Sequence, residues 1–296
     1  APLLSQPVFE LHLRVEFKLY KKLNNIQKHR GPDNQSYWSI NRVAIGHQRL
    51  SIIDLDERSN QPFIKDNLVI AFNGEIYNFK EIRKKLELNN KCKFITKSDT
   101  EVILEAYRIY KEKCLDLFRG MFSFVIYDVI ADTFFISRDH FGIKPLFYYI
   151  QKDKIAFASE LKTLTELPNF DKKINNKALL EYLNYLWITD KSCIFSSCFK
   201  LPASHYMLIN KSRDISIHRY WEIETNTLKV DQMDKAIKIT DQSICDSVNN
   251  HLVSDVPIGS FLSGGLDSSL ISVIAKKENK NLSTYTISFD EKDKLL

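Results

Sequence analysis

Residues 255–269 read DVPIGSFLSGGLDSS, and this stretch decides the architecture of the C-terminal part of the chain. The apolar run Pro257–Leu262 predicts a β-strand, the glycines after it predict a tight turn, and the residues up to about Lys277 predict a helix. A second strand is expected over Ser283–Phe289, which makes a βαβ unit and the opening of a parallel sheet. One such unit cannot bury both faces of its strands. We therefore expect residues 230–296 to be the truncated beginning of a larger α/β domain.

The turn itself, SGGLDSS at 263–269, has the chemistry of a phosphate loop. Gly264 and Gly265 let the backbone approach a ligand closely, and the serines add hydroxyl donors. The helix that begins near Asp267 offers free N–H groups, so the loop predicts a pyrophosphate site. Asp267 would repel phosphate unless a cation lies between them, which makes it a candidate Mg²⁺ ligand. The GxxxxGK[ST] pattern of a Walker A loop is missing, and a plain glycine turn is the alternative.

The longer N-terminal part has a different pattern, with short apolar runs separated by turns. Strands are expected over residues 43–45, 68–72, 122–127, 134–137, 146–150, 155–158 and, as a hairpin, 206–209 with 215–218. Two helices interrupt them, because Asn78 with Glu81 and Ser98 with Glu101 each form a capping-box pattern. Asp99 thus falls in the first turn of a helix. The mixture of strands and helices predicts an α+β domain.

A polar stretch over residues 222–233, EIETNTLKVDQM, predicts a linker between two domains. It separates residues 1–221 from residues 234–296, where an amphipathic helix is expected from Asp234 to about Leu252. At 296 residues, the chain has the length of about two ordinary domains.

Composition and charge exclude several classes of protein. No apolar run approaches the ~18 residues that a bilayer span needs, and no secretory signal pattern opens the sequence, so we expect no membrane partner. The net charge of +5 arises from 42 basic residues mixed with 37 acidic ones, which argues against a nucleic-acid partner. The five cysteines are odd in number and lack the spacing of a zinc site, which favours a reducing, cytoplasmic compartment.

Eight further motifs occur in the order in which the glutamine-hydrolysing asparagine synthetases carry them. They are HRGPD (29–33), GHQRLSIID (46–54), FNGEIYN (72–78), SDTE (98–101), FRGMFSF (118–124), RDHFGIKPLFY (138–148), ASELKTL (158–164) and KLPAS (200–204). With the phosphate loop they cover about residues 22–290, and the chain resembles this family. The resemblance implies a class II glutamine amidotransferase domain, with the αββα sandwich of N-terminal nucleophile enzymes, over residues 1–221. It implies the start of an ATP-pyrophosphatase-type, Rossmann-like synthetase domain over residues 234–296.

The resemblance also implies a glutamine site. Free glutamine is a zwitterion, and Arg49, with its guanidinium fork, and Asp99 match the family positions that bind its carboxylate and its ammonium group. Amide hydrolysis passes through an oxyanion, for which Asn73 (side chain) and Gly74 (backbone N–H) match the family's donors. The other implied glutamine-binding residues are Leu50, Ser51, Ile52, Ile53 and Glu75. Taken alone, the Asn-Gly pair fits a hairpin turn, Asp99 a helix-start acid and Arg49 a surface ion pair.

A second implied site binds ATP and pyrophosphate, with Mg²⁺ at Asp267. Its residues are Leu262, Ser263, Gly264, Gly265, Leu266, Asp267, Ser268, Ser269 and Ile287. The adenine is expected near Leu262 and Ile287. Two other sets are expected to be structural: His47 as a packed strand residue, and Arg83, Lys84 and Lys85 as a solvated helix face.

The sequence departs from the family pattern at its start, where about 22 residues are atypical. Glutaminases of this type attack the amide with a cysteine as first residue, whose α-amino group shuttles the proton. Here residue 1 is Ala, and the five cysteines lie at positions 92, 114, 193, 198 and 245. We therefore expect the chain as given to bind glutamine better than it cleaves it. Ser204 stands where the family usually has glycine, which concerns a local turn.

The leading interpretation is a glutamine-dependent asparagine synthetase. ATP would activate the side-chain carboxylate of aspartate as a β-aspartyl-adenylate, and ammonia from glutamine would amidate it to asparagine. One alternative is a sister amidotransferase that amidates another carboxylate, such as a sugar acid in polysaccharide synthesis. Another is a non-catalytic fragment that binds glutamine or a nucleotide. The implied cofactors are ATP and Mg²⁺, the implied partners are glutamine, aspartate and ATP, and a homodimer is compatible with the resemblance.

Overall fold

The chain folds into two units, and the computed structural model divides them between Ile223 and Glu224. The structure describes residues 6–11, 17–151, 154–189, 192–225 and 230–288. Within these residues, the strands form two six-stranded sheets and one two-stranded sheet. No helix in the described part of the chain combines the length and the apolar character that crossing a membrane requires.

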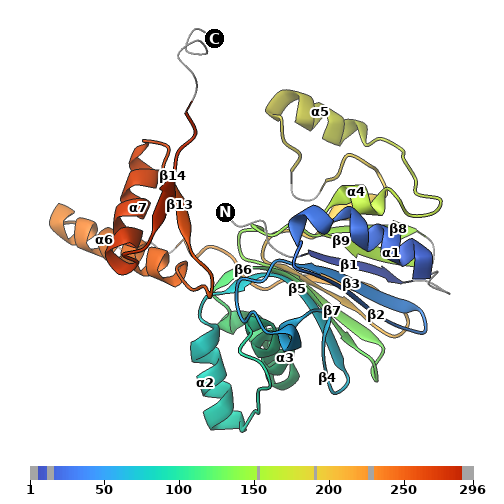
Figure 1. The fold of residues 1–296 in the computed structure, drawn as a ribbon. Helices are drawn as coiled ribbons and strands as arrows, with labels where there is room; N and C mark the ends of the chain where they lie inside the picture. The colour runs from blue at the N-terminus through green and yellow to red at the C-terminus, as the bar shows by residue number, and fades with distance from the viewer. Residues whose placement is uncertain (1–5, 12–16, 152–153, 190–191, 226–229, 289–296) are drawn as a thin grey trace. The chain divides into compact units, whose positions relative to one another are not determined.

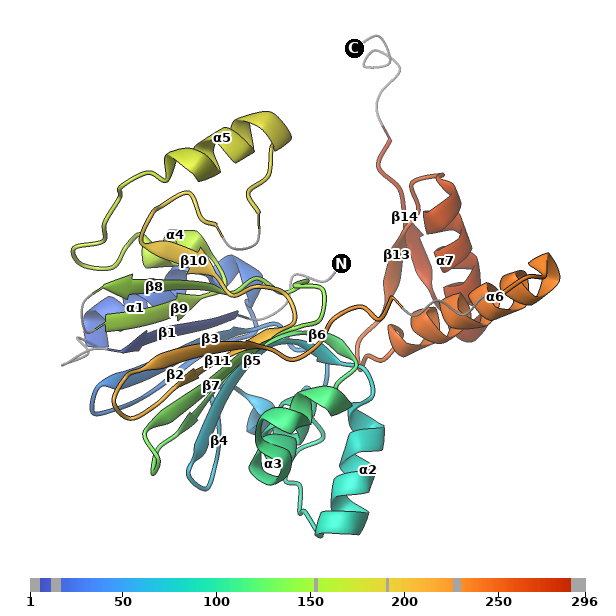
Figure 2. The same cartoon turned by 180° about the vertical axis from the view of Figure 1, so that it is seen from behind.

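The first sheet of the first unit is antiparallel and has the strand order β10-β8-β9-β1-β3-β2 (Figures 1 and 2). Its strands are β1 (Gln6–Leu11), β2 (Asn34–Ile40), β3 (Val43–Arg49), β8 (Phe147–Gln151), β9 (Lys154–Ala158) and β10 (Cys198–Lys200). β1 lies between β9 and β3, with Gln6 opposite Gln48. The start of β1 therefore lies beside the end of β3, where Arg49 is the last residue.

The second sheet is also antiparallel and has the order β12-β11-β7-β6-β5-β4. Its strands are β4 (Phe63–Lys65), β5 (Leu68–Ile76), β6 (Gly120–Asp128), β7 (Thr133–Arg138), β11 (His205–Ile209) and β12 (Ile215–Arg219). β5 and β6 pair over their full length, with Asn73 opposite Ser123 and Gly74 opposite Phe122. The strands predicted from apolar runs are thus present in both sheets.

The main hydrophobic core lies between the two sheets. Its buried members include Val43, Ile45, Val69, Ala71, Val125, Phe134, Ile136, Phe157, Met207 and Ile209. Because side chains alternate along a strand, β5 sends Val69 and Ala71 into this core and then Asn73 and Glu75 toward the same layer. Apolar packing therefore gives way to polar residues at one end of the sandwich, and the candidate site lies there.

Helices cover the outer faces of the two sheets (Figure 2). The helices are α1 (Phe17–Ile26), α2 (Phe79–Asn90), α3 (Asp99–Tyr110), α4 (Leu161–Leu164) and α5 (Asn176–Tyr185), with 3-10 turns at Lys28–Arg30, Glu57–Ser59 and Lys111–Leu117. Leu23 of α1 and Leu164 of α4 pack with β8 and β9 on the first sheet. Tyr107 of α3 stacks on Phe135 of the second, with ring centroids 4.8 Å apart. The four layers confirm the predicted αββα sandwich.

The two predicted helix starts differ in how they are capped. The Ser98 hydroxyl accepts a hydrogen bond from the Thr100 N–H (3.1 Å), as the predicted cap requires. The predicted return bond from Glu101 is wrong, because the Ser98 N–H donates to Thr96 Oγ1 (3.3 Å) and the Glu101 carboxylate accepts from Ile95 and Thr96. Asn78 precedes α2, but its amide donates to the Leu117 carbonyl (2.9 Å) and accepts from the Arg119 N–H (3.0 Å). The predicted side-chain cap at Asn78 is therefore wrong, because both ends of its amide already bind the segment that leads into β6.

Ser204 adopts the backbone conformation of a turn in which glycine is usual. Its φ is 61°, in the left-handed region that glycine enters without strain. The serine hydroxyl donates to the His140 carbonyl at 2.7 Å, a bond that glycine could not make. This bond offsets part of the conformational cost of a side chain at this position.

The second unit contains α6 (Met233–Asn250), β13 (Gly259–Phe261), α7 (Leu266–Glu278) and β14 (Ser283–Tyr285). β13 and β14 pair in parallel across the α7 connection, as the βαβ pattern predicts. Both strands are shorter than expected, and Phe289 lies outside the described residues. A small buried cluster of Val248, Ile274, Ala275 and Leu282 joins α6 to α7 and the chain that follows α7.

Candidate active site

A pocket lies at the polar end of the sandwich, where residues from the ends of β3 and β5 meet the start of α3. Its lining residues are Arg49, Leu50, Ile52, Ile53, Ser59, Gln61, Phe72, Gly74, Glu75, Ser98, Asp99 and Thr100. Most of the residues expected to bind glutamine are in this set, whereas Ser51 and Asn73 are not. The fold thus brings three separate motifs to one place.

Arg49 is 4% exposed and holds the loop that follows β3. Its Nη1 donates to the carbonyl of Asp56 (3.1 Å) and to Asn60 Oδ1 (2.8 Å). Its Nη2 donates to the carbonyls of Ile53 (3.3 Å) and Asp54. Both terminal nitrogens are therefore engaged by the protein, which differs from the open fork expected from the sequence. The guanidinium instead places a fixed positive charge in the wall of the pocket.

Two buried carboxylates, Asp99 and Glu75, form another part of the lining. Asp99 is in the first turn of α3, and its Oδ2 accepts the Ile76 N–H at 3.0 Å. Burial raises the pKa of Asp99 to about 6. Burial, with a contribution from the charge of Asp99, raises the pKa of Glu75 to about 7. Carboxylates in such surroundings gain from a cationic ligand, so this wall fits an ammonium group.

Asn73 and Gly74 lie near the end of β5. Asn73 is fully buried, and neither Nδ2 nor Oδ1 of its amide has a hydrogen-bond partner among the described residues. Gly74 has a φ of 149°, and a Cβ there would lie 2.0 Å from the Met121 carbonyl oxygen, so only glycine fits. A rigid strand thus carries a buried amide donor without a partner, which is suited to a developing oxyanion.

The loop after β7 is organised by Asp139, which is fully buried. Its carboxylate accepts four backbone N–H groups, those of Phe122 (3.2 Å), Phe141 (3.1 Å), Ile143 (2.9 Å) and Lys144 (2.9 Å). Lys144 is itself buried, and burial lowers its pKa to about 8 against the opposing effect of the Glu75 carboxylate. The loop therefore brings a lysine charge toward the carboxylates of the pocket.

Two buried side chains that sequence reasoning missed join the walls of the pocket. Asp54 Oδ2 accepts the Lys97 N–H (2.6 Å) and the Ser59 hydroxyl (2.5 Å), which ties the loop after β3 to the start of α3. Gln61 donates to Thr100 Oγ1 at 3.2 Å and makes a second tie. Asp54 is the last residue of the motif GHQRLSIID (46–54), whereas no local pattern marks Gln61.

The residues expected to be structural are only partly so. His47 is fully buried, its Nε2 lies 3.1 Å from a carbonyl oxygen of β5, and burial lowers its pKa to about 3, which fits a neutral, packed strand residue. Lys84 and Lys85 are exposed on α2. The solvated-face expectation is wrong for Arg83, because its Nη1 donates to the Thr96 carbonyl at 2.7 Å.

The predicted phosphate loop of the second unit joins β13 to α7. Gly264 has a φ of 82°, and no atom lies within 4 Å of the position of a Cβ there. The hydroxyls of Ser268 and Ser269 donate to the Gly265 carbonyl at 3.1 and 2.8 Å, and the Oγ atoms of Ser263 and Ser268 are 3.0 Å apart. The serines therefore shape the loop. The N–H groups of the first turn of α7, which have no partner within the helix, are the donors left for an anion.

The other residues expected at this loop surround the same strand ends. Asp267 is exposed in the first turn of α7. The Leu262 N–H donates to the Tyr285 carbonyl at 2.8 Å, and the Leu262 carbonyl accepts from the Thr286 hydroxyl at 2.7 Å. Ile287 follows and is 79% exposed. One carboxylate with open space beside it is compatible with the way Mg²⁺ binds together with phosphates.

A family model described as a glutamine amidotransferase domain matches residues 9–221. The chain belongs to this glutamine amidotransferase family. A second family model, described as asparagine synthase, matches residues 240–295. The amidotransferase match therefore covers the first unit almost completely, and the other match lies within the second unit.

Curated relatives of this chain are named as asparagine synthetases. The chain is 39% identical over 276 residues to asparagine synthetase [glutamine-hydrolyzing] 1 of Bacillus subtilis, with 93% of the chain and 43% of the relative covered. It is 33% identical over 296 residues to asparagine synthetase [glutamine-hydrolyzing] 3 of the same organism, with 97% and 48% covered. The chain thus spans about half the length of these relatives.

Among solved structures, the chain resembles the glutamine phosphoribosylpyrophosphate amidotransferase of B. subtilis in complex with ADP and GMP. The TM-score is 0.53 at 15% identity, and the match covers 97% of this chain and 67% of that one. At this identity the likeness concerns the fold alone.

Proposed function

We propose that the first unit holds a binding site for free glutamine, the nitrogen donor for a synthetase domain that begins in the second unit. The observation that carries the proposal is one small pocket lined by a buried guanidinium, Arg49, and by two buried carboxylates, Asp99 and Glu75. A free α-amino acid carries the opposite charges on adjacent groups. A pocket with this charge pattern therefore favours an amino acid over neutral ligands and over ligands with one charge.

Each residue of the pocket then has a distinct role. Asp99 and Glu75 bind the ammonium group, and the charge of Arg49 attracts the carboxylate toward the loop formed by Leu50, Ser51, Ile52 and Ile53. The Asn73 Nδ2 and the Gly74 N–H stabilise the oxyanion that forms when the amide is attacked. Cys92, Cys114, Cys193, Cys198 and Cys245 do not line the pocket, so none of them is assigned the attack.

The second unit would bind the pyrophosphate portion of ATP at residues 263–269, with the adenine against the backbone near Leu262 and Ile287. The names of the relatives support aspartate as the acceptor of the ammonia and asparagine as the product. ATP supplies activation of the acceptor carboxylate, and Mg²⁺ held by Asp267 would offset the charge of the phosphates. Backbone N–H groups at the start of α7 would make most of the anion contacts.

Calorimetric titration with glutamine and two truncated ligands tests the first site. Glutaramate lacks the α-amino group and 4-aminobutyramide lacks the carboxylate. We expect glutamine to bind and each analogue to bind at least about tenfold more weakly, since each loses one charge-assisted contact. Equal affinity for glutamine and glutaramate would contradict the roles of Asp99 and Glu75.

Pyrophosphate titration with and without Mg²⁺ tests the second site. We expect binding to require Mg²⁺ and Asp267→Asn to weaken it, with glutamine binding unchanged. Asp234→Asn, in the first turn of α6, is the matched control because it removes a carboxylate at a different helix start. If Asp267→Asn binds pyrophosphate as the unchanged chain does, the loop is a structural turn.

A further inference from the structure

The segment that leads into α3 is held by a carboxylate from the helix itself. Glu101 is fully buried, and its two carboxylate oxygens accept the Ile95 N–H at 3.0 and 3.1 Å. Its Oε2 also accepts the N–H and the hydroxyl of Thr96, each at 2.7 Å. This exceeds what a helix cap needs, because the cap of α3 is already supplied by Ser98. Glu101 therefore fixes Ile95 and Thr96 within residues 93–98, the held segment that precedes the helix.

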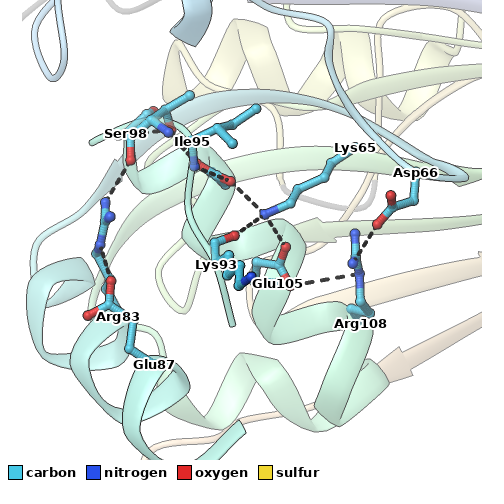
Figure 3. A network of polar contacts seen from close by, with 11 residues as sticks. Lys65, Asp66, Arg83, Glu87, Lys93, Ile95, Ser98, Glu105 and Arg108 are labelled. Carbon is cyan, nitrogen blue, oxygen red and sulfur yellow. Dashed lines mark hydrogen bonds and ion pairs between the residues drawn. The ribbon is translucent and has the colours of Figure 1, made fainter. Parts of the chain in front are cut away.

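A lysine from a different element supports that carboxylate. Lys65, at the end of β4, places Nζ 2.7 Å from Glu101 Oε1. This atom is also 2.6 Å from Glu105 Oε1 (Figure 3). The same Nζ donates to the Lys93 carbonyl at 2.5 Å. Burial opposes the charge of Lys65, but its bonds to the two carboxylates raise its pKa, so the lysine is charged at neutral pH.

The held segment is continuous with the ammonium-binding carboxylate. Thr96, bound by Glu101, accepts the Ser98 N–H on its Oγ1 at 3.3 Å, and Asp99 is the next residue. On the other side, Asp99 Oδ2 accepts the Ile76 N–H at 3.0 Å. A shift of the segment would therefore move Asp99 relative to the end of β5, and a displacement of about 1 Å is enough to weaken a ligand contact.

We propose that Lys65 and Glu101 are positioning residues, which set the Asp99 carboxylate for the ammonium group of the amino-acid ligand. The inference rests on the proposed glutamine site. A role in stability alone does not account for this cluster, because a buried ion pair contributes little net stability compared with apolar side chains of similar size. Apart from the ion pairs, its bonds go to Lys93, Ile95 and Thr96, which is the arrangement that positioning requires.

Lys65→Met tests the proposal, because it removes the charge and keeps most of the apolar stem. Arg108→Met is the matched control: Arg108 belongs to the same network through Asp66 (2.6 Å) and Glu105 (3.8 Å), but none of its described contacts is to the held segment. We expect Lys65→Met to raise the Kd for glutamine at least about fivefold, and Arg108→Met to change it less than about twofold.

Hydrogen exchange of the Ile76 amide provides a second measurement that needs no ligand. This amide donates to Asp99, so its exchange reports the position of that carboxylate. We expect faster exchange in Lys65→Met and an unchanged rate in Arg108→Met. If exchange changes as expected but the unmodified chain binds no glutamine, the proposed function fails and the positioning role stands. If Lys65→Met matches Arg108→Met in exchange, the positioning role is overturned.

The double variant Lys65→Met/Glu101→Gln separates positioning from stability. It removes Glu101, one of the two carboxylates that would be buried without Lys65, and leaves Glu105 paired only with Arg108, so we expect thermal stability to recover part of the way toward that of the original chain. The charge-assisted bonds to Ile95 and Thr96 are still lost, so glutamine affinity should stay low. Recovery of both properties in the double variant would show that Lys65 acts on stability alone.

Discussion

Arg49 is bonded to the protein through both terminal nitrogens, so its removal affects the loop and the ligand together. We predict that Arg49→Ala weakens glutamine binding by about 1.5 to 3 kcal/mol, because a charge opposite the ligand carboxylate is lost and buried carbonyls lose their donor. Lys84→Ala, on the exposed face of α2, should change binding by less than about 0.5 kcal/mol. Calorimetric titration measures both variants, and similar losses would remove Arg49 from the binding site.

Asp99 and Glu75 make glutamine binding depend on pH. Their pKa values are about 6 and about 7, and an ammonium group is bound by the ionised forms. Affinity should therefore rise as the pH increases through this range. Asp99→Asn should weaken binding at pH 8 and leave Glu75 as the main group that titrates. A Kd that is constant from pH 5 to pH 8 would contradict this assignment.

The same two carboxylates should have the opposite effect on stability. Their pKa values in the unfolded chain are near 3.8 and 4.5, so the folded form retains protons that the unfolded form has released. Their contribution is fully present below about pH 4, and the free energy of unfolding should fall as the pH rises to about 7. We predict that Asp99→Asn raises the free energy of unfolding at pH 8, by about 1 to 2 kcal/mol, while it weakens glutamine binding. Urea denaturation at pH 4.5 and pH 8 measures the difference.

At the scale of elements, β5 carries near its end a glycine, Gly74, that the neighbouring strand requires. A Cβ on Gly74 would lie 2.0 Å from a backbone oxygen of β6, so we predict that Gly74→Ala costs more than about 3 kcal/mol of stability. Gly142 is the comparison in the same unit: its φ is 65°, but the nearest atom to its Cβ is the Arg138 guanidinium carbon at 2.9 Å, at the end of a long side chain. Gly142→Ala should cost about 1 to 2 kcal/mol in the same denaturation assay. Equal losses would mean that the backbone at Gly74 can move.

Elements with a strong local pattern could be predicted from the sequence. The positions of β5, β6 and β7 were predicted correctly from their apolar runs, and the start of α3 was predicted correctly from Ser98. β1, α1 and α5 could not be recognised in the same way. The structure of β1 depends on pairing with β3 and β9, which are distant in the sequence. α5 has apolar side chains that are largely exposed, so its pattern does not mark a buried face.

In the candidate site too, some residues could be predicted from the sequence and others could not. Arg49, Glu75 and Asp99 could be proposed because they lie in motifs whose order is informative, and the structure places them in one pocket. The roles of Asp54, Gln61 and Lys65 depend on contacts across 36 to 43 residues of sequence, which no local pattern encodes. The engagement of Arg49 by loop carbonyls is also a tertiary feature, because the loop must fold back on β3 before those acceptors meet the guanidinium.

At the scale of the whole molecule, the two units bury very different amounts of apolar surface. The first has a core between two sheets, whereas the second has a small cluster and a strand, β14, whose residues are all exposed. We predict that the amides of β13 and β14 exchange with deuterium at least about 100-fold faster than those of β5 and β6, because local opening costs less where fewer contacts are lost. Mass spectrometry of peptides from both units measures the rates. Similar protection in both would contradict this prediction.

The Asp139 loop has a consequence for protein engineering. One carboxylate satisfies four backbone amides, and the last of them belongs to the lysine that approaches the pocket. Three of the four lie within five residues of Asp139, so most of the information that shapes the loop is contained in a short, portable piece of sequence. A graft of residues 138–145 onto another antiparallel hairpin brings Asp139 with it. The host hairpin must then offer one free strand amide in the place of Phe122. In a host that lacks this amide, the Asp139 loop would lose one of its four hydrogen bonds and would no longer hold Lys144 in its orientation.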